Sequence, residues 1–141
     1  MRPTRRTANR TAGRTAAGAA AGASLAGLAT LCTAFWPAPA VAGPAEVVAA
    51  EAVASGATWR FSATVRHGDT GWDHYADAWR VVGPDGTVYG TRELLHPHVD
   101  EQPFTRSLSG VAIPEGVDRV RVEARDSVHG WGGPSVEVTL D

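Results

Sequence analysis

The stretch ATWRFSATVRH, residues 57–67, alternates apolar and polar side chains along most of its length. Its apolar positions are Trp59, Phe61, Ala63 and Val65, and its polar positions are Arg60, Ser62, Thr64 and Arg66. Successive side chains of a strand point to opposite faces of a sheet, so this period of two predicts a strand with one buried and one exposed face. The pattern therefore indicates a half-buried β-strand and not a helix.

Similar segments follow at short intervals, separated by turn residues. Residues 75–82 place Trp79 and Val81 on one face, and GPDG at residues 83–86 then predicts a turn into a second strand at 87–94. Further strands are expected at residues 104–110, 118–125 and 135–140. A first strand is also expected in AEVVAAEAVA, residues 45–54, although its composition would allow a helix.

These segments predict an all-β fold: an immunoglobulin-like antiparallel β-sandwich of about seven strands, with Trp79 buried on the third strand. A small closed barrel is the structural alternative. Arg106 shares the strand parity of Phe104 and Leu108, so its side chain starts on the inward face. A long arginine can bury its stem while its head reaches a carboxylate, and we expect a structural ion pair there.

The first 42 residues differ from the rest of the chain. They contain five arginines and no acid, an apolar stretch from Ala16 to Trp36, and the small residues Ala40-Val41-Ala42 before Gly43. This order is typical of a cleavable secretory signal peptide. We predict a signal peptide at 1–42 and one domain at 43–141. An uncleaved anchor is the alternative, because the apolar stretch approaches the roughly 20 residues that span a bilayer.

We expect the protein to be exported, to the periplasm or the extracellular space, with no stable membrane span after cleavage. The pair Arg5-Arg6 suits the twin-arginine route, but the usual apolar residues after the pair are missing, so the Sec and twin-arginine routes both stay open. The segment LATLC, residues 28–32, resembles a lipoprotein acylation site only loosely, because Leu31 stands where a small residue is expected.

Charge and sulfur content narrow the classes of partner. Without the signal peptide, eight arginines face 15 acids, a net charge of −7 that argues against nucleic acid or an anionic membrane as partner. The only cysteine and the only methionine, Cys32 and Met1, belong to the signal peptide. The mature domain therefore lacks the thiolate and thioether ligands of blue-copper, iron–sulfur and copper(I) sites.

The predicted topology places three loops at one end of the sandwich, following the strands at 58–66, 87–94 and 118–125. All five histidines fall in these loops: His67 and His74 in the first, His96 and His98 in the second, and His129 in the third. The same loops contain Asp69, Asp73, Asp100, Glu101, Asp126, Trp72 and Trp131. Because loops on a rigid scaffold often form binding sites, we predict a histidine- and carboxylate-rich binding end.

Metal binding is the leading hypothesis for this end. Residues i and i+2 of an extended segment project to the same side, so His96 and His98 could chelate one ion, with Pro97 restricting the backbone between them. Three or four nitrogen and oxygen ligands are typical of zinc or copper(II), the two expected ions. The candidates for the further ligands are His74, His129, His67 and Asp100.

The same loops could instead bind an exported protein or a carbohydrate without metal. Trp72 and Trp131 each stand beside a glycine and suit an exposed aromatic platform, although they could equally cap the open end of the core. The histidines would then serve as hydrogen-bonding or pH-responsive groups. The other residues assigned to this surface are Asp73, Glu101 and Asp126.

Catalysis is not expected. Asp126, Ser127 and His129 contain the residue types of a hydrolytic triad, but neighbours within one loop rarely reach the geometry that such chemistry needs. We therefore assign no catalytic residue and predict a non-enzymatic domain.

The run from Gly71 to Gly133 resembles a group of small exported bacterial proteins with no known activity. The segments that carry the resemblance are GWDHYADAW, LLHPHVDEQPFTRSLSG and RDSVHGWGG. The resemblance implies export and implies nothing about catalysis.

Overall fold

The computed structural model describes residues 42–141, so the signal peptide predicted for residues 1–42 lies, apart from Ala42, outside the described residues. The strands are β1 Glu46–Ser55, β2 Thr58–Arg66, β3 Ala76–Val82, β4 Val88–Glu93, β5 Phe104–Val111, β6 Arg119–Asp126, β7 Gly130–Trp131 and β8 Val136–Thr139. Within this part of the chain, no helix has the length and apolar character needed to cross a membrane.

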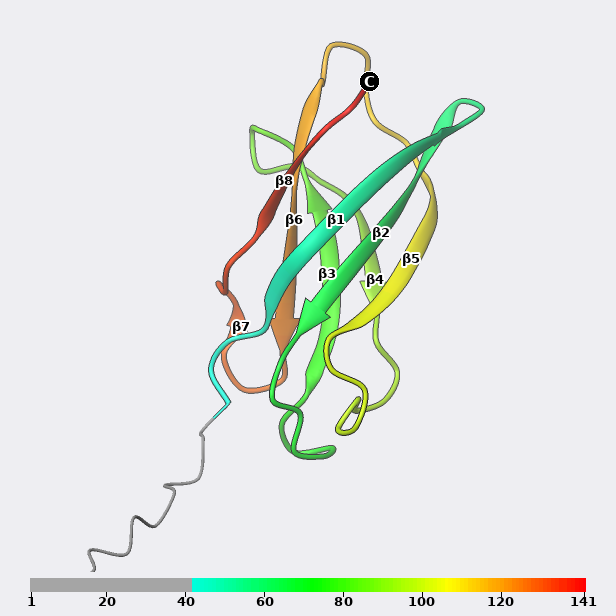
Figure 1. The fold of residues 1–141 in the computed structure, drawn as a ribbon. Helices are drawn as coiled ribbons and strands as arrows, with labels where there is room; N and C mark the ends of the chain where they lie inside the picture. Colours follow the sequence, from blue (N-terminus) through cyan, green and yellow to red (C-terminus); the bar gives the residue numbers. More distant parts are fainter. Residues whose placement is uncertain (1–41) are drawn as a thin grey trace, which may run out of the picture. The chain divides into compact units, whose positions relative to one another are not determined.

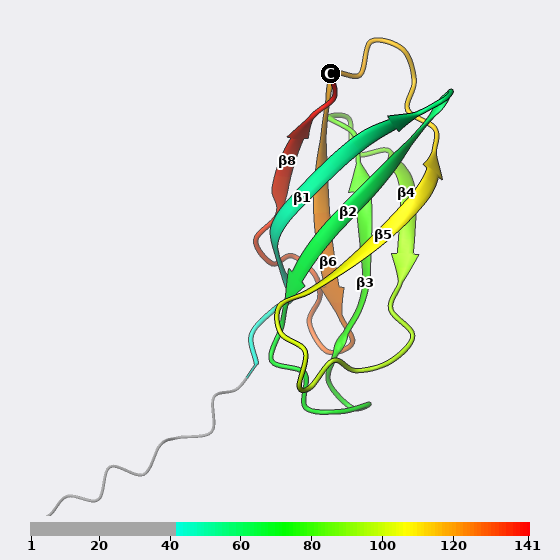
Figure 2. The same cartoon turned by 45° about the vertical axis from the view of Figure 1, so that its right-hand side comes forward.

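The strands pair into two antiparallel sheets. One sheet has the order β1-β2-β5, and the other has the order β4-β3-β6-β7, with β8 also paired to β6. Figures 1 and 2 show the first sheet lying across the second. The predicted all-β sandwich is therefore confirmed, and the closed barrel is wrong because the strands form two separate sheets.

The alternation in β2 produces the expected buried face. Phe61, Ala63 and Val65 have no exposed surface, whereas the two residues between them, Ser62 and Thr64, are half-buried. β2 is the central strand of its sheet and pairs with β1 on one side and β5 on the other. The segment that allowed either a strand or a helix forms β1, which pairs with β2 along its length. The alternation of apolar and polar residues thus places one face of this sheet in the core.

The core lies between the two sheets. Trp79 on β3 is fully buried, as predicted, and it packs in one cluster with Phe61 and Phe104 from the opposite sheet. Burial of large apolar side chains in this way contributes about 25 cal/mol per Å² of apolar surface removed from water. The core therefore fixes how the two sheets face each other. The sheets in turn position the loops that connect their strands.

Three loops lie together at one end of the sandwich, which we call the loop end. They are residues 67–75 after β2, residues 94–103 after β4, and residues 127–129 after β6. Figure 1 shows these loops at the lower end of the domain. β7 was not expected: it lies inside the predicted third loop and pairs Trp131 with Arg125.

Candidate metal site

Two buried carboxylates and several backbone groups join the three loops. The backbone N–H of His98, in the β4–β5 loop, donates to Asp69 Oδ2 in the β2–β3 loop at 2.6 Å. The β6–β7 loop reaches the β2–β3 loop through the N–H of Ser127, which donates to the carbonyl of Tyr75 at 3.0 Å. The loops are therefore held against one another and not extended separately into solvent.

The five histidines form two groups at this end. His74 lies near both His67 and His129, with ring centroids 4.7 and 5.1 Å away. His96 and His98 form the second group, with ring centroids 4.6 Å apart. The structure thus brings together the histidines of the first and third loops, and it keeps the His-Pro-His pair as a separate unit.

His67, His74 and Asp126 form a compact group of metal-ligating side chains. One ligand atom from each residue lies within 4.8 Å of the others. The side chains of His67 and Asp126 have no exposed surface, and that of His74 is 16% exposed. A buried group of two imidazoles and one carboxylate could hold a metal ion through nitrogen and oxygen.

Asp69 selects the tautomer of His67. Asp69 accepts hydrogen bonds from three groups: His67 Nδ1 at 2.6 Å, the N–H of Ala76 at 2.9 Å and the N–H of His98. In the neutral imidazole this acceptor places the proton on Nδ1 and the lone pair on Nε2. His67 Nε2 is buried and has no hydrogen-bond partner among the described residues. Metal-binding histidines usually carry such a carboxylate on their other ring nitrogen.

Asp126 is the last residue of β6, and its carboxylate accepts several hydrogen bonds. Its Oδ1 accepts from the N–H groups of Val128 and His129 at 3.0 and 2.7 Å, from His129 Nδ1 at 3.0 Å and from His74 Nε2 at 3.1 Å. Burial alone would raise the pKa of Asp126, but the backbone N–H groups of His129, Val128 and Ala45, with the His129 side chain, outweigh burial and lower the pKa to about 2.

An ionised Asp126 also selects the tautomer of its two histidine neighbours. A neutral His74 donates to it from Nε2 and a neutral His129 donates from Nδ1, and each neutral ring then has its lone pair on the other nitrogen. His129 is 38% exposed and lies at the outer side of the group. It is the nearest described histidine that could add a further ligand to His67, His74 and Asp126.

The His-Pro-His pair has different surroundings. The ring of His98 stacks on Phe104 with centroids 3.8 Å apart, and its Nε2 lies 3.0 Å from Arg106 Nη2. Burial, followed by the nearby charge of Arg106, lowers the pKa of His98. Arg106 also pairs with Glu101, its Nη2 lying 3.0 Å from Oε2, which confirms the ion pair expected for this arginine. A guanidinium beside His98 Nε2 opposes a cation at that atom.

The remaining predicted residues lie around the rim. Asp73, Asp100, Glu101, His96 and Trp72 are exposed. Trp131 is half-buried, and the guanidinium of Arg80 covers one side of its ring at 4.1 Å. Asp126, assigned from sequence to a partner surface, is instead fully buried, because it satisfies the N–H groups of the β6–β7 turn.

Asp69 is the residue whose role the sequence did not single out. It follows His67 by two residues, and the tight turn between them is closed by its own N–H donating to the carbonyl of His67 at 2.9 Å. The segment His67-Gly68-Asp69 was therefore a local signal for a histidine oriented by a carboxylate.

Comparison with known proteins gives a similar sequence but no activity. No family model matches the chain. Over 88 residues the chain is 45% identical to the "Putative lipoprotein" of Halomicrobium mukohataei, an alignment that covers 62% of this chain and 43% of the relative. The chain therefore spans less than half the length of that relative. The name describes a lipoprotein and assigns no activity, which confirms the predicted resemblance to exported proteins.

Two solved structures are similar in fold. A hypothetical protein from Pyrococcus horikoshii OT3 aligns with a TM-score of 0.47 and 16% identity, covering 69% of this chain and 89% of that chain. A superoxide reductase in the oxidised state aligns with a TM-score of 0.42 and 15% identity, covering 70% of this chain and 90% of that chain. At these TM-scores neither structure bears on the function.

Proposed function

We propose that this protein is an exported, non-enzymatic binding domain that holds a divalent metal ion, zinc or copper(II), between His67, His74 and Asp126. The observation that carries the proposal is His67 Nε2, a buried nitrogen with no hydrogen-bond partner among the described residues, on a side chain that groups with His74 and Asp126 so that one ligand atom of each lies within 4.8 Å of the others. A metal ion would take up the lone pair of that nitrogen.

The ordinary alternative is a buried histidine with a purely structural role. Such a residue would normally have both ring nitrogens satisfied, because a buried polar atom without a partner costs about 1–3 kcal/mol. In this domain, one nitrogen of His67 is held by Asp69 and the other is left free. The cost of that arrangement is recovered if the free nitrogen binds a ligand.

The donor atoms favour zinc or copper(II). Two imidazoles and a carboxylate supply three ligands, and both ions bind imidazole nitrogen well. Asp126 is negatively charged at neutral pH because of its low pKa, so it would offset part of the ion's charge. The fourth position would be filled by His129 or by water. The pair His96 and His98 stays a second candidate site, weakened by Arg106 at His98 Nε2.

Export is also part of the proposal. The composition of residues 1–42 supports it, as does the similarity to a protein named as a lipoprotein. The mass of the mature protein tests the form of the exported product: cleavage after Ala42 leaves residues 43–141, whereas acylation would leave a chain that begins at Cys32 with attached lipid.

The test is a calorimetric titration of the untagged, exported protein with zinc and with copper(II). We expect one ion per chain. The double variant His67→Ala/His74→Ala should lose at least about tenfold in affinity, and Asp69→Asn, which keeps the ligands but loosens His67, should lose roughly 10–100-fold. The matched control is His96→Ala/His98→Ala, which removes the same number of imidazoles and should leave the affinity unchanged.

Two outcomes would contradict the assignment. Protein that binds neither ion better than scattered surface histidines would exclude the metal function and leave the loop end as a surface for a protein or carbohydrate. Affinity that is lost in the His96/His98 control and kept in the His67/His74 variant would move the site to the His-Pro-His pair. Circular dichroism of each variant shows whether it still folds.

A further inference from the structure

The outer face of the β4-β3-β6-β7 sheet contains a hollow that the metal site does not use. Its floor is Ala78 on β3, which pairs with Glu93 on β4 and with Arg125 on β6. A small side chain between two long ones leaves a depression in the sheet surface. We call it the Ala78 hollow. Its volume is about 320 Å³, at the lower end of the roughly 300–1,000 Å³ found for small-ligand sites.

Aromatic side chains form one wall of the Ala78 hollow. Trp131 on β7 and Tyr75 before β3 both line it. Trp131 is held in place, because Arg80 lies over its ring at 4.1 Å and is itself bound to Glu123, with Nη2 and Oε2 2.9 Å apart. A ring that is fixed before a ligand arrives loses little conformational freedom on binding, which favours affinity.

The polar wall contains an acceptor without a partner. Asp77 Oδ1 is buried and has no hydrogen-bond partner among the described residues, whereas Asp77 Oδ2 lies 3.4 Å from Arg125 Nη1. Burial raises the pKa of Asp77, and the charge of Arg125 opposes that rise only in part. Glu93 adds a second carboxylate to the lining, and Thr91 adds a hydroxyl. The exposed Glu93 carboxylate and Thr91 hydroxyl therefore offer acceptors for hydroxyl or amine donors, whereas Asp77 Oδ1 is covered and needs a small side-chain movement to accept one.

We propose that the Ala78 hollow is a carbohydrate-binding site that takes a neutral sugar residue. A sugar ring combines an apolar C–H face, which packs on an aromatic ring such as Trp131, with hydroxyls that can donate to Asp77 and Glu93 and accept from Arg125. This combination matches the aromatic wall and the acceptor wall together.

Other ligand classes match the hollow less well. A small anion would face two carboxylates, Asp77 and Glu93, with one arginine to offset them. An apolar ligand would remove Asp77 and Arg125 from water without giving them hydrogen bonds, and such burial is costly. A small organic cation would be attracted by the two carboxylates and the aromatic rings, but it could accept no hydrogen bond from Arg125.

The experiment uses the untagged, exported protein and two neutral trisaccharides, cellotriose and maltotriose, with tetramethylammonium as a charged probe. Binding is followed by NMR, using the indole N–H signals of the tryptophans. We expect at least one trisaccharide to shift the Trp131 signal with a dissociation constant on the order of 1 mM, a value common for a small open site.

Three variants make the test specific. Ala78→Leu fills the floor and keeps every polar group, so it should weaken sugar binding at least about tenfold, and Trp131→Ala should do the same by removing the aromatic wall. Trp72→Ala is the comparison variant, because Trp72 is 68% exposed on a neighbouring loop and does not line the hollow, although its ring meets that of Tyr75 edge-on with centroids 5.7 Å apart. Its sugar affinity should fall much less than that of Trp131→Ala. Thermal unfolding confirms that each variant is folded.

Three results would overturn the proposal. The first is the absence of any shift with either trisaccharide in folded wild-type protein. The second is a loss of sugar binding in Trp72→Ala equal to that in Trp131→Ala, which would place binding on the exposed loop. The third is binding of tetramethylammonium in preference to both sugars, which would make the hollow a cation site. None of these results depends on the metal, because no residue of the metal group lines the hollow.

Discussion

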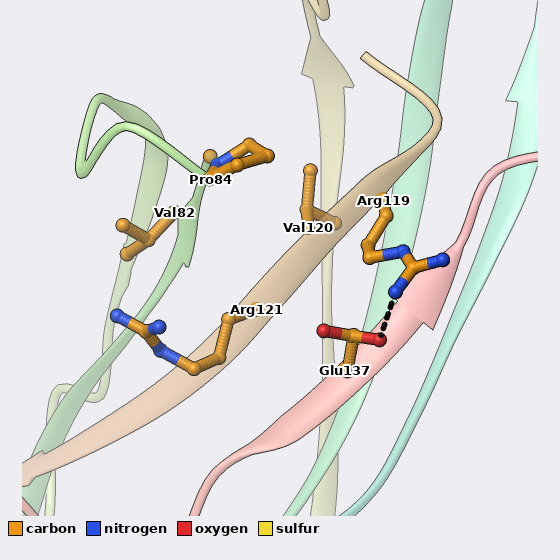
Figure 3. Close-up of a pocket in the computed structure, with 7 residues that line it drawn as sticks. Val82, Pro84, Arg119, Val120, Arg121 and Glu137 are labelled. Atoms are coloured by element: carbon orange, nitrogen blue, oxygen red, sulfur yellow. Dashed lines mark ion pairs between the residues drawn. The ribbon is translucent and has the colours of Figure 1, made fainter.

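The two ends of the sandwich are built in opposite ways. The loop end buries polar groups: His67, Asp69, His98 and Asp126 are all less than 7% exposed and bond to one another or to the loop backbones. At the opposite end, the chain reverses through short turns, and a hollow of about 60 Å³ lies beside Val82 and Val120 (Figure 3). The dashed line in Figure 3 marks its only drawn ion pair, Arg119 with Glu137 at 3.2 Å.

The difference shows where the fold buries polar groups, which is energetically unfavourable. The turn at Gly83–Gly86 only needs to reverse the chain, and its backbone groups bond within the turn: the N–H of Gly83 donates to the carbonyl of Thr87 at 2.8 Å, and the N–H of Gly86 donates to the carbonyl of Gly83 at 3.0 Å. Buried charged and hydrogen-bonding groups are costly unless every one is satisfied. The loop end satisfies nearly all of them but leaves nitrogens of His67 and His98 without partners. A site retained despite that cost is the better candidate for function.

The largest expected effect comes from Asp126→Ala at the loop end. The substitution leaves the N–H groups of Val128 and His129 and two imidazoles without their acceptor. We expect a loss of about 3 kcal/mol or more in the free energy of unfolding, because several buried donors lose their partner at once. Urea denaturation measures it. A loss below about 1 kcal/mol would mean that the loop end is not a cooperative network.

Metal should stabilise the loop end specifically. An ion that binds only the folded chain adds about 2.7 kcal/mol at a free concentration 100 times its dissociation constant. We therefore expect zinc or copper(II) to raise the melting temperature of the wild type and to raise that of His67→Ala/His74→Ala by half as much or less. Equal shifts in both proteins, measured by calorimetry, would show that the ion acts elsewhere.

The pH dependence follows from the low pKa of Asp126. Its pKa in the folded state is about 2, below the ordinary value of 3.8, so its contribution is fully present above pH 3.8 and is lost as the pH falls through 3.8 towards about 2. The contribution is about 2 kcal/mol. The measurement compares urea denaturation at pH 6 and pH 2.5 for wild type and Asp126→Asn. A variant with the same acid sensitivity as the wild type would refute this assignment.

The smallest effect is expected at the opposite end. Glu137→Ala removes the ion pair with Arg119, whose two side chains are 56% and 61% exposed. Solvent screens such a pair, so we expect a change within about 0–1 kcal/mol in the free energy of unfolding. Urea denaturation beside Asp126→Ala gives the contrast directly. A Glu137→Ala loss as large as the Asp126→Ala loss would remove the distinction between the two ends.

Much of the fold could be predicted from local pattern. The period of two in residues 57–67 matches the buried face of β2, and the turn at GPDG matches the connection from β3 to β4. β7 could not be predicted, because a strand of two residues, Gly130–Trp131, carries no periodic signal. Its pairing depends on the neighbouring end of β6 and not on its own sequence.

The candidate site could be predicted only in outline. The loops and their residue types were expected, and HPH at residues 96–98 was favoured as the chelating pair. The sequence did not show that His98 would stack on Phe104 and face Arg106. Whether that pair binds an ion stays a prediction. Asp126 was expected on a surface, since nothing local reveals that a carboxylate at a strand end will be covered by another loop.

By itself, the sequence determined most of the strands and the end of the sandwich at which each loop lies. It also determined the ligand atoms that residues 43–141 can offer a metal, which are nitrogen and oxygen without sulfur. Those properties follow from short-range alternation and composition. The tertiary structure alone decided which donors meet. His74 and Asp126 are 52 residues apart in the chain and 3.1 Å apart in space. That contact exists because β3 and β6 pair with Ala76 opposite Asp126, after a register shift between Ala76 and Ala78, and this pairing depends on the packing of the whole core and not on either segment.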